Sequence, residues 1–425
     1  MLAAVPRAAQ ARAEALETAA RIVDDVRERG EDALREQAER FDRVTDHAIR
    51  VPSEHIAEAL ASVDPVVRAA LEEAILRVRQ GSAAQVPDSR TTAIGPGAQI
   101  VQRWQPVTRA GVYIPGGKAP LASSVVMNVV PAQVAGVTSI ALASPPQSDG
   151  RVHATILAAA GLLGISEVYA IGGAGAIGAL AWGVAAIGLD PVDVVSGPGN
   201  NYVASAKRAV AGVVGTDSEA GATEILIVAD AAADARLIAA DLVSQAEHDE
   251  QASAVLVTDD PALAERVAAE VEQIAARTRH SERVGVSLAG PQSAIVLVDD
   301  RAMATAFSNA YAPEHLELHL TDAEAAASAF TSAGAVFVGD QTPVSLGDYM
   351  AGSNHVLPTG GQARYAPGLG AYTFLRPQQV ISYDHAALAA VRAGVVALAN
   401  AEVLPAHGEA IEARFQGAAG GAATL

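Results

Sequence analysis

The chain contains no cysteine among its 425 residues. It can therefore form no disulfide, no thiolate metal site and no iron–sulfur cluster. A cysteine nucleophile is excluded as well. Any metal site in this chain must use nitrogen and oxygen ligands, a set that suits zinc or manganese.

Aromatic residues are also scarce, at 4% of the sequence, whereas hydrophobic residues make up 50%. The core must therefore be built mainly from Ala, Val, Leu and Ile. Basic residues are outnumbered by acidic ones, 29 to 48, which gives a formal charge of −19. Such a charge repels phosphates, so neither nucleic acid nor an anionic membrane is an expected partner. No apolar run is long enough to span a membrane, and the first residues lack the apolar centre of a signal peptide. We expect a soluble, cytoplasmic protein.

Hydrophobic periodicity predicts an α/β protein with two parallel sheets. Residues 7–80 have helical periodicity, and short apolar strands alternate with helices from about residue 100. The alternation restarts after Thr223, so two Rossmann-like domains are expected, with a helical N-terminal region and a helical C-terminal tail. The predicted boundaries are 1–100, 101–222, 223–380 and 381–425. Residues 416–425 are rich in Gly and Ala and are predicted to be disordered.

Three glycine-rich loops follow predicted strands: 115–118, 171–176 and 196–200. Each one alone is more often a tight turn than a ligand site. Together in one sheet they indicate a cleft for a cofactor or phosphate. None has the full GxGxxG pattern with an acidic residue about 20 positions later. Because ligands of such sheets bind beyond the carboxyl ends of strands, the loops that follow strands are expected to carry the site.

Polar residues in three other segments are candidates for chemistry. Gln245 and His248 lie three residues apart at the end of a predicted helix, so they should enter the interior side by side and could reach one cation. Taken alone, however, these two residues are better interpreted as the polar last turn of a packed helix. Glu314 and His315 are an acid/base pair or a chance surface pair. Residues 345–358 form either an ordinary loop or a binding loop, in which Asp348 is a candidate oxygen ligand.

Together these segments resemble histidinol dehydrogenase. The resemblance rests on Ser244-Gln-Ala-Glu-His248, Tyr311-Ala-Pro-Glu-His-Leu316, Gly347-Asp348 with Asn354-His-Val-Leu-Pro358, Glu402 through His407, and the glycine-rich loops. It runs in order from the N-terminal helices to His407. The fold that it implies is aldehyde-dehydrogenase-like. The implied activity is oxidation of L-histidinol to L-histidine through L-histidinal with two NAD, the last step of histidine biosynthesis.

The resemblance also implies a role for particular residues. Each subunit of a homodimer would hold one zinc, with one ligand supplied by the tail of the partner. The implied metal ligands are Gln245, His248, Asp348 and His407, and the implied acid/base pair is Glu314 and His315. The implied substrate contacts are Thr223, Gln245, His248, His315, Asp348, His355, Glu402 and His407, and the implied cofactor contacts are Tyr113, Gly175 and Asn200.

Two positions depart from the family pattern. Gly175 stands where the family usually has Gln, and Thr223 where it has Ser, although Thr keeps the hydroxyl. Three alternatives to the main reading are a related zinc and NAD dehydrogenase of another small polar alcohol, a metal-dependent hydrolase with Glu314 as base, and a non-catalytic binding protein.

Overall fold

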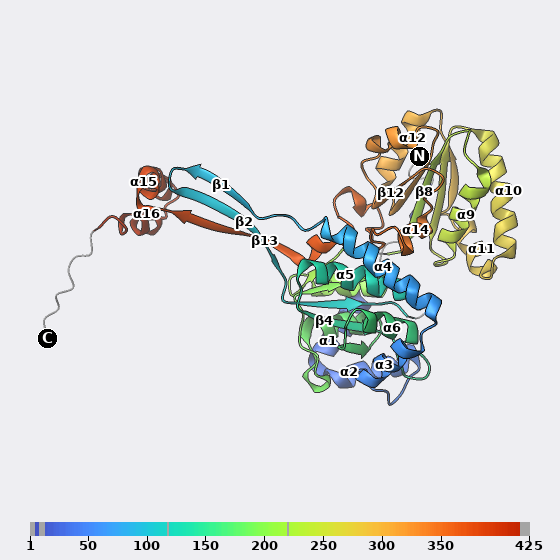
Figure 1. Ribbon diagram of the computed structural model, residues 1–425, viewed down its shortest axis with the longest axis horizontal. Helices are drawn as coiled ribbons and strands as arrows, with labels where there is room; N and C mark the ends of the chain where they lie inside the picture. The colour runs from blue at the N-terminus through green and yellow to red at the C-terminus, as the bar shows by residue number, and fades with distance from the viewer. Residues whose placement is uncertain (1–4, 8–12, 117–118, 219–220, 417–425) are drawn as a thin grey trace. The chain divides into compact units, whose positions relative to one another are not determined.

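The computed structural model describes residues 5–7, 13–116, 119–218 and 221–416. The chain divides into two compact units, each built from stretches that are separate in sequence (Figure 1). The main unit comprises Met1–Val86 and Pro106–Phe374, and the small unit comprises Pro87–Gln105 and Leu375–Leu425. The four sequence-based domain boundaries followed the chain in continuous segments and stay a prediction. No helix in the described part of the chain is long and apolar enough to cross a membrane.

The first sheet of the main unit is entirely parallel, with the order β5-β4-β3-β6-β7. Its strands are β3(Arg109–Tyr113), β4(Ser139–Ser144), β5(Val168–Ala170), β6(Val194–Ser196) and β7(Gly215–Thr216), connected through α5(Ala122–Ala135), α6(Ala154–Leu162), α7(Gly173–Trp182), η3(Ala185–Ile187) and α8(Asn201–Val210). Because β3 is central and the chain then moves first to one side and later to the other, the order reverses between β3 and β6. This is the place where doubly wound sheets bind their ligands.

The N-terminal helices cover this first sheet. They are α1(Ala13–Arg29), α2(Glu31–Gln37), the π-helix η2(Ala38–Asp42), α3(Ser53–Ser62) and α4(Pro65–Ala83). α1 packs on α7 and α8, α3 on α6, and α4 on α5. Asp64 starts α4, because its carboxylate accepts from the backbone N–H of Val66 and Val67 while Pro65 occupies the first helical position.

The second sheet repeats the same order, as β10-β9-β8-β11-β12, and is also parallel. Its strands are β8(Glu224–Ala229), β9(Ser253–Thr258), β10(Ala294–Leu297), β11(His315–His319) and β12(Ala335–Val338), with helices α9(Ala235–Ala246), α10(Pro261–Arg277), α11(Ser281–Ala289), α12(Arg301–Tyr311), α13(Ala323–Ala326), η4(Ala327–Ala329) and α14(Val344–Tyr349). Along β8, Ile225 and Ile227 pack into one hydrophobic cluster, while Leu226 and Val228 pack into another. Both faces are therefore buried, as expected for a parallel sheet. The predicted α/β fold with two parallel sheets is confirmed.

The small unit contains an antiparallel sheet that the sequence did not predict. Its strands are β1(Arg90–Gly95), β2(Ala98–Pro106) and β13(Leu375–Tyr383), in the order β1-β2-β13. The prediction of a helical region up to residue 100 is wrong for β1, whose side chains are all exposed and therefore show no hydrophobic alternation. α15(His385–Ala401) and α16(Pro405–Glu412) pack against each other (Figure 1). Of the segment predicted to be disordered, 417–425 lies outside the described residues.

Candidate active site

The predicted acid/base pair lies at the amino ends of the strands of the second sheet. Glu314 and His315 open β11, and Thr223 directly precedes β8 beside it. α9 runs back against β8, so Gln245 in its last turn returns to the same edge of the sheet. The expectation that only loops following strands carry the site is therefore wrong for this sheet. Gln245 lies on α9, the helix that connects β8 to β9, and not in a loop that follows a strand.

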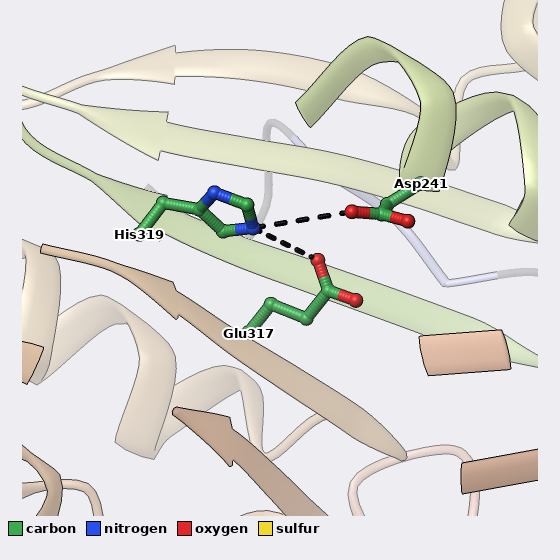
Figure 2. A group of neighbouring side chains, drawn as sticks. All are labelled: Asp241, Glu317 and His319. Carbon is green, nitrogen blue, oxygen red and sulfur yellow. Dashed lines mark hydrogen bonds and ion pairs between the residues drawn. The ribbon is translucent and has the colours of Figure 1, made fainter. Parts of the chain in front are cut away.

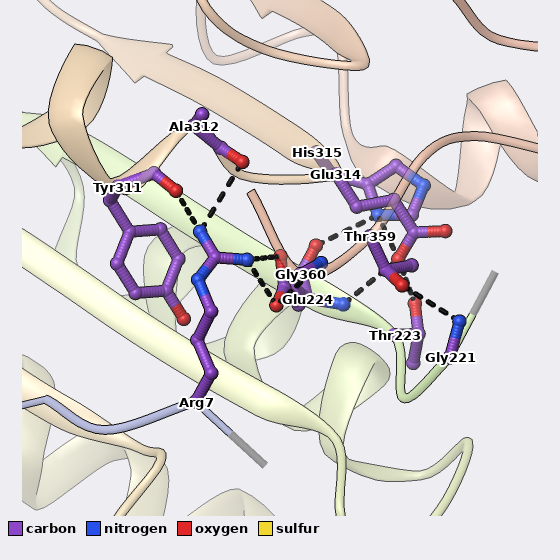
Figure 3. A network of polar contacts seen from close by, with 10 residues as sticks. All are labelled: Arg7, Gly221, Thr223, Glu224, Tyr311, Ala312, Glu314, His315, Thr359 and Gly360. Carbon is purple, nitrogen blue, oxygen red and sulfur yellow. Dashed lines mark hydrogen bonds and ion pairs between the residues drawn. The ribbon is translucent and has the colours of Figure 1, made fainter. Parts of the chain in front are cut away.

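The hydroxyl of Thr223 connects Gln245 to Glu314. Nε2 of Gln245 donates to Oγ1 of Thr223 at 2.6 Å. This Oγ1 donates to Oε2 of Glu314 at 2.6 Å (Figure 3). An amide nitrogen only donates, so Oγ1 of Thr223 accepts from Gln245 and gives its one proton to the ionised carboxylate of Glu314. The backbone N–H of Glu224 donates to the same Oε2 at 2.9 Å. Burial raises the pKa of Glu314 to about 8, although these hydrogen bonds and His248 favour its ionised form.

The imidazole of His315 lies beside this carboxylate, with Nδ1 3.5 Å from Oε2 of Glu314. Its Nδ1 lies 3.0 Å from the backbone oxygen of Glu224. Since a carbonyl oxygen only accepts, Nδ1 carries the proton and Nε2 keeps its lone pair. Burial lowers the pKa of His315, so the ring is neutral at neutral pH. A neutral imidazole with a free lone pair can accept a proton from an alcohol.

A second buried carboxylate, Glu224, is neutralised by Arg7. The guanidinium of Arg7 contacts both oxygens of Glu224, at 2.5 and 2.6 Å, and also the backbone oxygen of Tyr311 (Figure 3). It also stacks 4.1 Å from the centre of the Tyr311 ring. Burial raises the pKa of Glu224 to about 7, and Arg7 opposes this shift. Arg7 thus limits the negative charge near Glu314, a role that no local motif revealed.

Three of the four implied metal ligands are placed in the main unit. The amide nitrogen of Gln245 donates to Thr223. Its amide oxygen, Oε1, is buried and has no hydrogen-bond partner among the described residues. Nε2 of His248 lies 3.9 Å from Oδ2 of Asp348. An unsatisfied buried oxygen is costly and suits a cation ligand, and the donor set fits a divalent metal such as zinc.

The position of His248 differs from the prediction. α9 ends at Ala246, so His248 is not carried into the interior beside Gln245, and 44% of its side chain is exposed. Glu247 is the C-cap residue of α9, so His248 lies just beyond the end of the helix. Glu402 and His407 belong to the small unit, where both are exposed. Their place in the site stays a prediction.

His355 is held from two sides. Its Nδ1 lies 3.0 Å from the backbone oxygen of Asp348, and its Nε2 lies 3.0 Å from Oγ of Ser124 at the start of α5. Because the carbonyl oxygen only accepts, Nδ1 donates to it and Nε2 accepts from Ser124. Burial lowers the pKa of His355. The segment 345–358, expected to be a loop, begins with the short helix α14, which carries Asp348.

Comparison with known proteins identifies the family. Residues 5–415 match the family described as histidinol dehydrogenase. The chain belongs to the histidinol dehydrogenase family. It is 66% identical to the histidinol dehydrogenase of Leifsonia xyli subsp. xyli over 407 residues, which cover 95% of this chain and 93% of that protein. It is 54% identical to that of Thermobifida fusca, covering 97% and 94% of the two chains.

Solved structures of the family have the same fold. The crystal structure of histidinol dehydrogenase from Elizabethkingia anophelis matches with a TM-score of 0.92 at 33% identity, covering 97% of this chain and 95% of that chain. The predicted family is thus confirmed, and the chain is an oxidoreductase. The hydrolase and the non-catalytic binding protein are not supported, because this is a family of dehydrogenases.

Gly175, one of the residues proposed to contact the cofactor, has the side chain of Gln37 directly beside it. A Cβ on Gly175 would lie 2.0 Å from Oε1 of Gln37, at the end of α2. The side-chain amide of Gln37 therefore occupies the space that a side chain at residue 175 would enter. Oη of Tyr113 accepts from the backbone N–H of Gly173 at 3.1 Å. Asn200 caps α8 with its side-chain oxygen, so only its amide nitrogen is left to donate to a cofactor.

A second group of side chains that could bind a metal ion lies on α9 and β11. Asp241 on α9 faces Glu317 and His319 on β11, and Nε2 of His319 lies 3.3 Å from Glu317 and 4.0 Å from Asp241 (Figure 2). Burial and the negative charge of Glu317 raise the pKa of Asp241 to about 7. The other oxygen of Glu317 accepts from the backbone N–H of Val344 at 2.6 Å and so anchors the start of α14. The sequence did not predict this cluster, which helps to position the helix carrying Asp348.

Proposed function

We propose that the chain oxidises L-histidinol to L-histidine through L-histidinal, using two NAD and one zinc per subunit, in the last step of histidine biosynthesis. The observation that carries this proposal is the juxtaposition of a buried carboxylate, a neutral imidazole and an unsatisfied ligand oxygen. Glu314, His315 and Gln245 supply them at one edge of the second sheet. A cytoplasmic location, where NAD is available, belongs to the same proposal.

In the first oxidation, Nε2 of His315 accepts the proton of the alcohol as the carbinol carbon loses a hydride to NAD. In the second oxidation, Glu314 accepts a proton from a water molecule that adds to the aldehyde, while His315 returns its proton to the carbonyl oxygen and becomes neutral again. His315 then takes a hydroxyl proton of the hydrated aldehyde as a second hydride leaves. No thiol is needed, in keeping with the absence of cysteine.

Gln245, His248 and Asp348 would hold the metal, and zinc would supply a positive charge that positions the imidazole and amine of the substrate. The hydroxyl of Thr223 orients the amide of Gln245 and the carboxylate of Glu314 together. The imidazole of His355 would contact the substrate. Its Nε2 would exchange the hydrogen bond with Ser124 for one with the substrate.

The direct test is NADH formation from a panel of amino alcohols, with and without a chelator. Two NADH per molecule of L-histidinol, lost on chelation and regained with zinc, are expected. Faster turnover of another small polar alcohol would replace histidinol by that substrate, and chelator-resistant activity would contradict the metal site.

We also propose a homodimer in which each active site takes Glu402 and His407 from the partner subunit. The small unit supports this, because large apolar side chains on its sheet and helices are exposed, among them Ile94, Ile381 and Leu398. Val403, next to Glu402, has a φ of 60°, which β-branched residues rarely adopt, and is 82% exposed. Such strain is typical of functional segments.

Mixing two inactive variants tests the shared site. Glu314→Gln and His407→Asn would disable opposite halves, so a mixed dimer regains one intact site. Equal mixing, after dissociation and reassociation, should recover about a quarter of wild-type aldehyde oxidation, since half of the dimers are mixed and each has one intact site of two. The same mixing of Glu314→Gln with Thr223→Val, whose defects would lie in the same half, is the control and should show no aldehyde oxidation beyond the residual activity of the Thr223→Val sites. Equal behaviour of both mixtures would contradict the shared site.

A further inference from the structure

A carboxylate without a partner lies at the carboxyl edge of the first sheet. Asp42 ends η2, and both of its side-chain oxygens lie 3.4 Å from where a Cβ on Gly172 would be. Pro145, directly after β4, approaches the same point at 3.0 Å. The charge of Asp42 also reaches Tyr113 at the end of β3, where it opposes ionisation of the phenol. Asp42 therefore faces the ends of β3, β4 and β5 together.

Nothing in the described part of the chain neutralises Asp42. No hydrogen bond or ion pair to its side chain occurs there. It is half-buried, and burial raises its pKa to about 6. A desolvated carboxylate without a partner destabilises a fold, and such groups cluster at binding sites.

A second polar group at this edge also lacks a partner. Oγ of Ser144, the last residue of β4, is fully buried and unpaired among the described residues. It lies 3.1 Å from where a Cβ on Gly116 would be, in the glycine-rich loop that follows β3. Two unsatisfied polar groups and two glycines at one sheet edge indicate a polar ligand that approaches the backbone closely.

The order of the sheet indicates which part of a dinucleotide belongs here. In sheets of this order an acidic residue near the end of the second strand binds the adenosine ribose. The second strand here is β4, which ends in Ser144-Pro145 and provides no acid. Asp42 lies against that Pro145–Gly172 edge although it comes from the N-terminal helical region. It supplies from outside the sheet the acid that the sequence pattern lacks.

We propose that Asp42 accepts hydrogen bonds from the ribose hydroxyls of the adenosine half of NAD and selects NAD over NADP. This inference rests on the proposed function, in which NAD is the oxidant. An ionised carboxylate can accept from both hydroxyls at once. A 2′-phosphate in the same place would bring negative charge against Asp42, with no cation of the described residues to offset it.

Asp42→Asn in the full-length enzyme tests the proposal by equilibrium binding as well as by rate. NADH and ADP-ribose should bind about tenfold or more weakly, because a hydrogen bond to a charged acceptor is replaced by a neutral one. The ratio of kcat/KM for NAD to that for NADP should fall about tenfold or more. The kcat at saturating NAD should stay unchanged, and the melting temperature should stay equal or rise, because an unpaired carboxylate is removed.

Asp46→Asn is the matched control. Asp46 is exposed in the segment that follows η2 and has a φ of 53°, which Asn tolerates. The same loss of charge there should leave cofactor binding and NADP discrimination at wild-type values.

Unchanged NADH affinity and NADP discrimination in Asp42→Asn would overturn the proposal. A lower melting temperature with unchanged binding would do the same, since it would make Asp42 structural. Weaker binding of nicotinamide mononucleotide, with ADP-ribose unaffected, would place Asp42 at the other half of the cofactor and also overturn it. Absence of NADH formation from histidinol in the wild-type enzyme would instead refute the proposed function itself.

Discussion

Replacement of Thr223 by Val tests whether one hydroxyl couples the metal ligand to the base. Val keeps the branched shape but can neither accept from Gln245 nor donate to Glu314. A hydrogen bond to a charged group contributes about 1.5–3 kcal/mol. Its loss from the ionised form of Glu314 should raise the pKa of this carboxyl by roughly one to two units, from the value of about 8.

The sign of the effect follows from the role of Glu314 as a base. Only the ionised carboxylate accepts a proton, so wild-type oxidation of L-histidinal should rise with pH through the pKa of Glu314, which burial raises. In Thr223→Val the rise should move to higher pH, and at pH 7 the rate should fall on the order of tenfold or more. Zinc affinity should fall as well, because the amide of Gln245 loses the partner that orients it.

The assay is kcat/KM for L-histidinal as a function of pH, together with zinc binding. Thr223→Ser is the control, since it retains the hydroxyl and should retain the wild-type profile. A Val variant with an unshifted profile would refute the coupling. An equal shift in the Ser variant would assign the effect to the lost methyl group rather than to the hydroxyl.

Two further changes have distinct expected outcomes. Glu314→Gln should leave oxidation of histidinol to histidinal largely intact and slow the oxidation of histidinal by about 100-fold or more, measured with each substrate separately; equal losses would contradict the division of roles between Glu314 and His315. Asp241→Asn should raise the free energy of unfolding at pH 8 by about 1–2 kcal/mol, because it removes a buried charge next to Glu317. The pKa of Asp241 is raised in the folded state, to about 7, so the wild-type chain loses stability as pH rises to that value, and the difference between the two proteins should shrink by pH 4 in denaturant titrations.

Much of the fold could be predicted because both sheets follow the apolar periodicity of the chain. β8 and β9 appear as short continuous apolar runs, and polar caps such as Asp260 precede the helices between strands. β1 could not be predicted in this way. All of its side chains are exposed, so the strand produces no alternation of apolar and polar residues in the sequence.

The site was predictable where its residues share a short motif. Glu314 and His315 are adjacent, and the structure places His315 at the start of the expected strand, with Glu314 directly before it. Arg7, Gln37 and Asp42 belong to no such motif. Each contacts residues that are distant in the sequence, so its role is visible only in the folded chain. A solitary charged residue near a chain end or at the end of a helix has the same local pattern whether it is solvated or buried against a distant strand.

The contact between Gln37 and Gly175 makes the two positions mutationally dependent. With Gln37 in place, any side chain at residue 175 collides with the Oε1 atom that already fills the space. A side chain at residue 175 therefore requires that the amide of Gln37 turn away or that a smaller residue stand at position 37. Substitutions at the two positions are expected to be non-additive in their effect on stability.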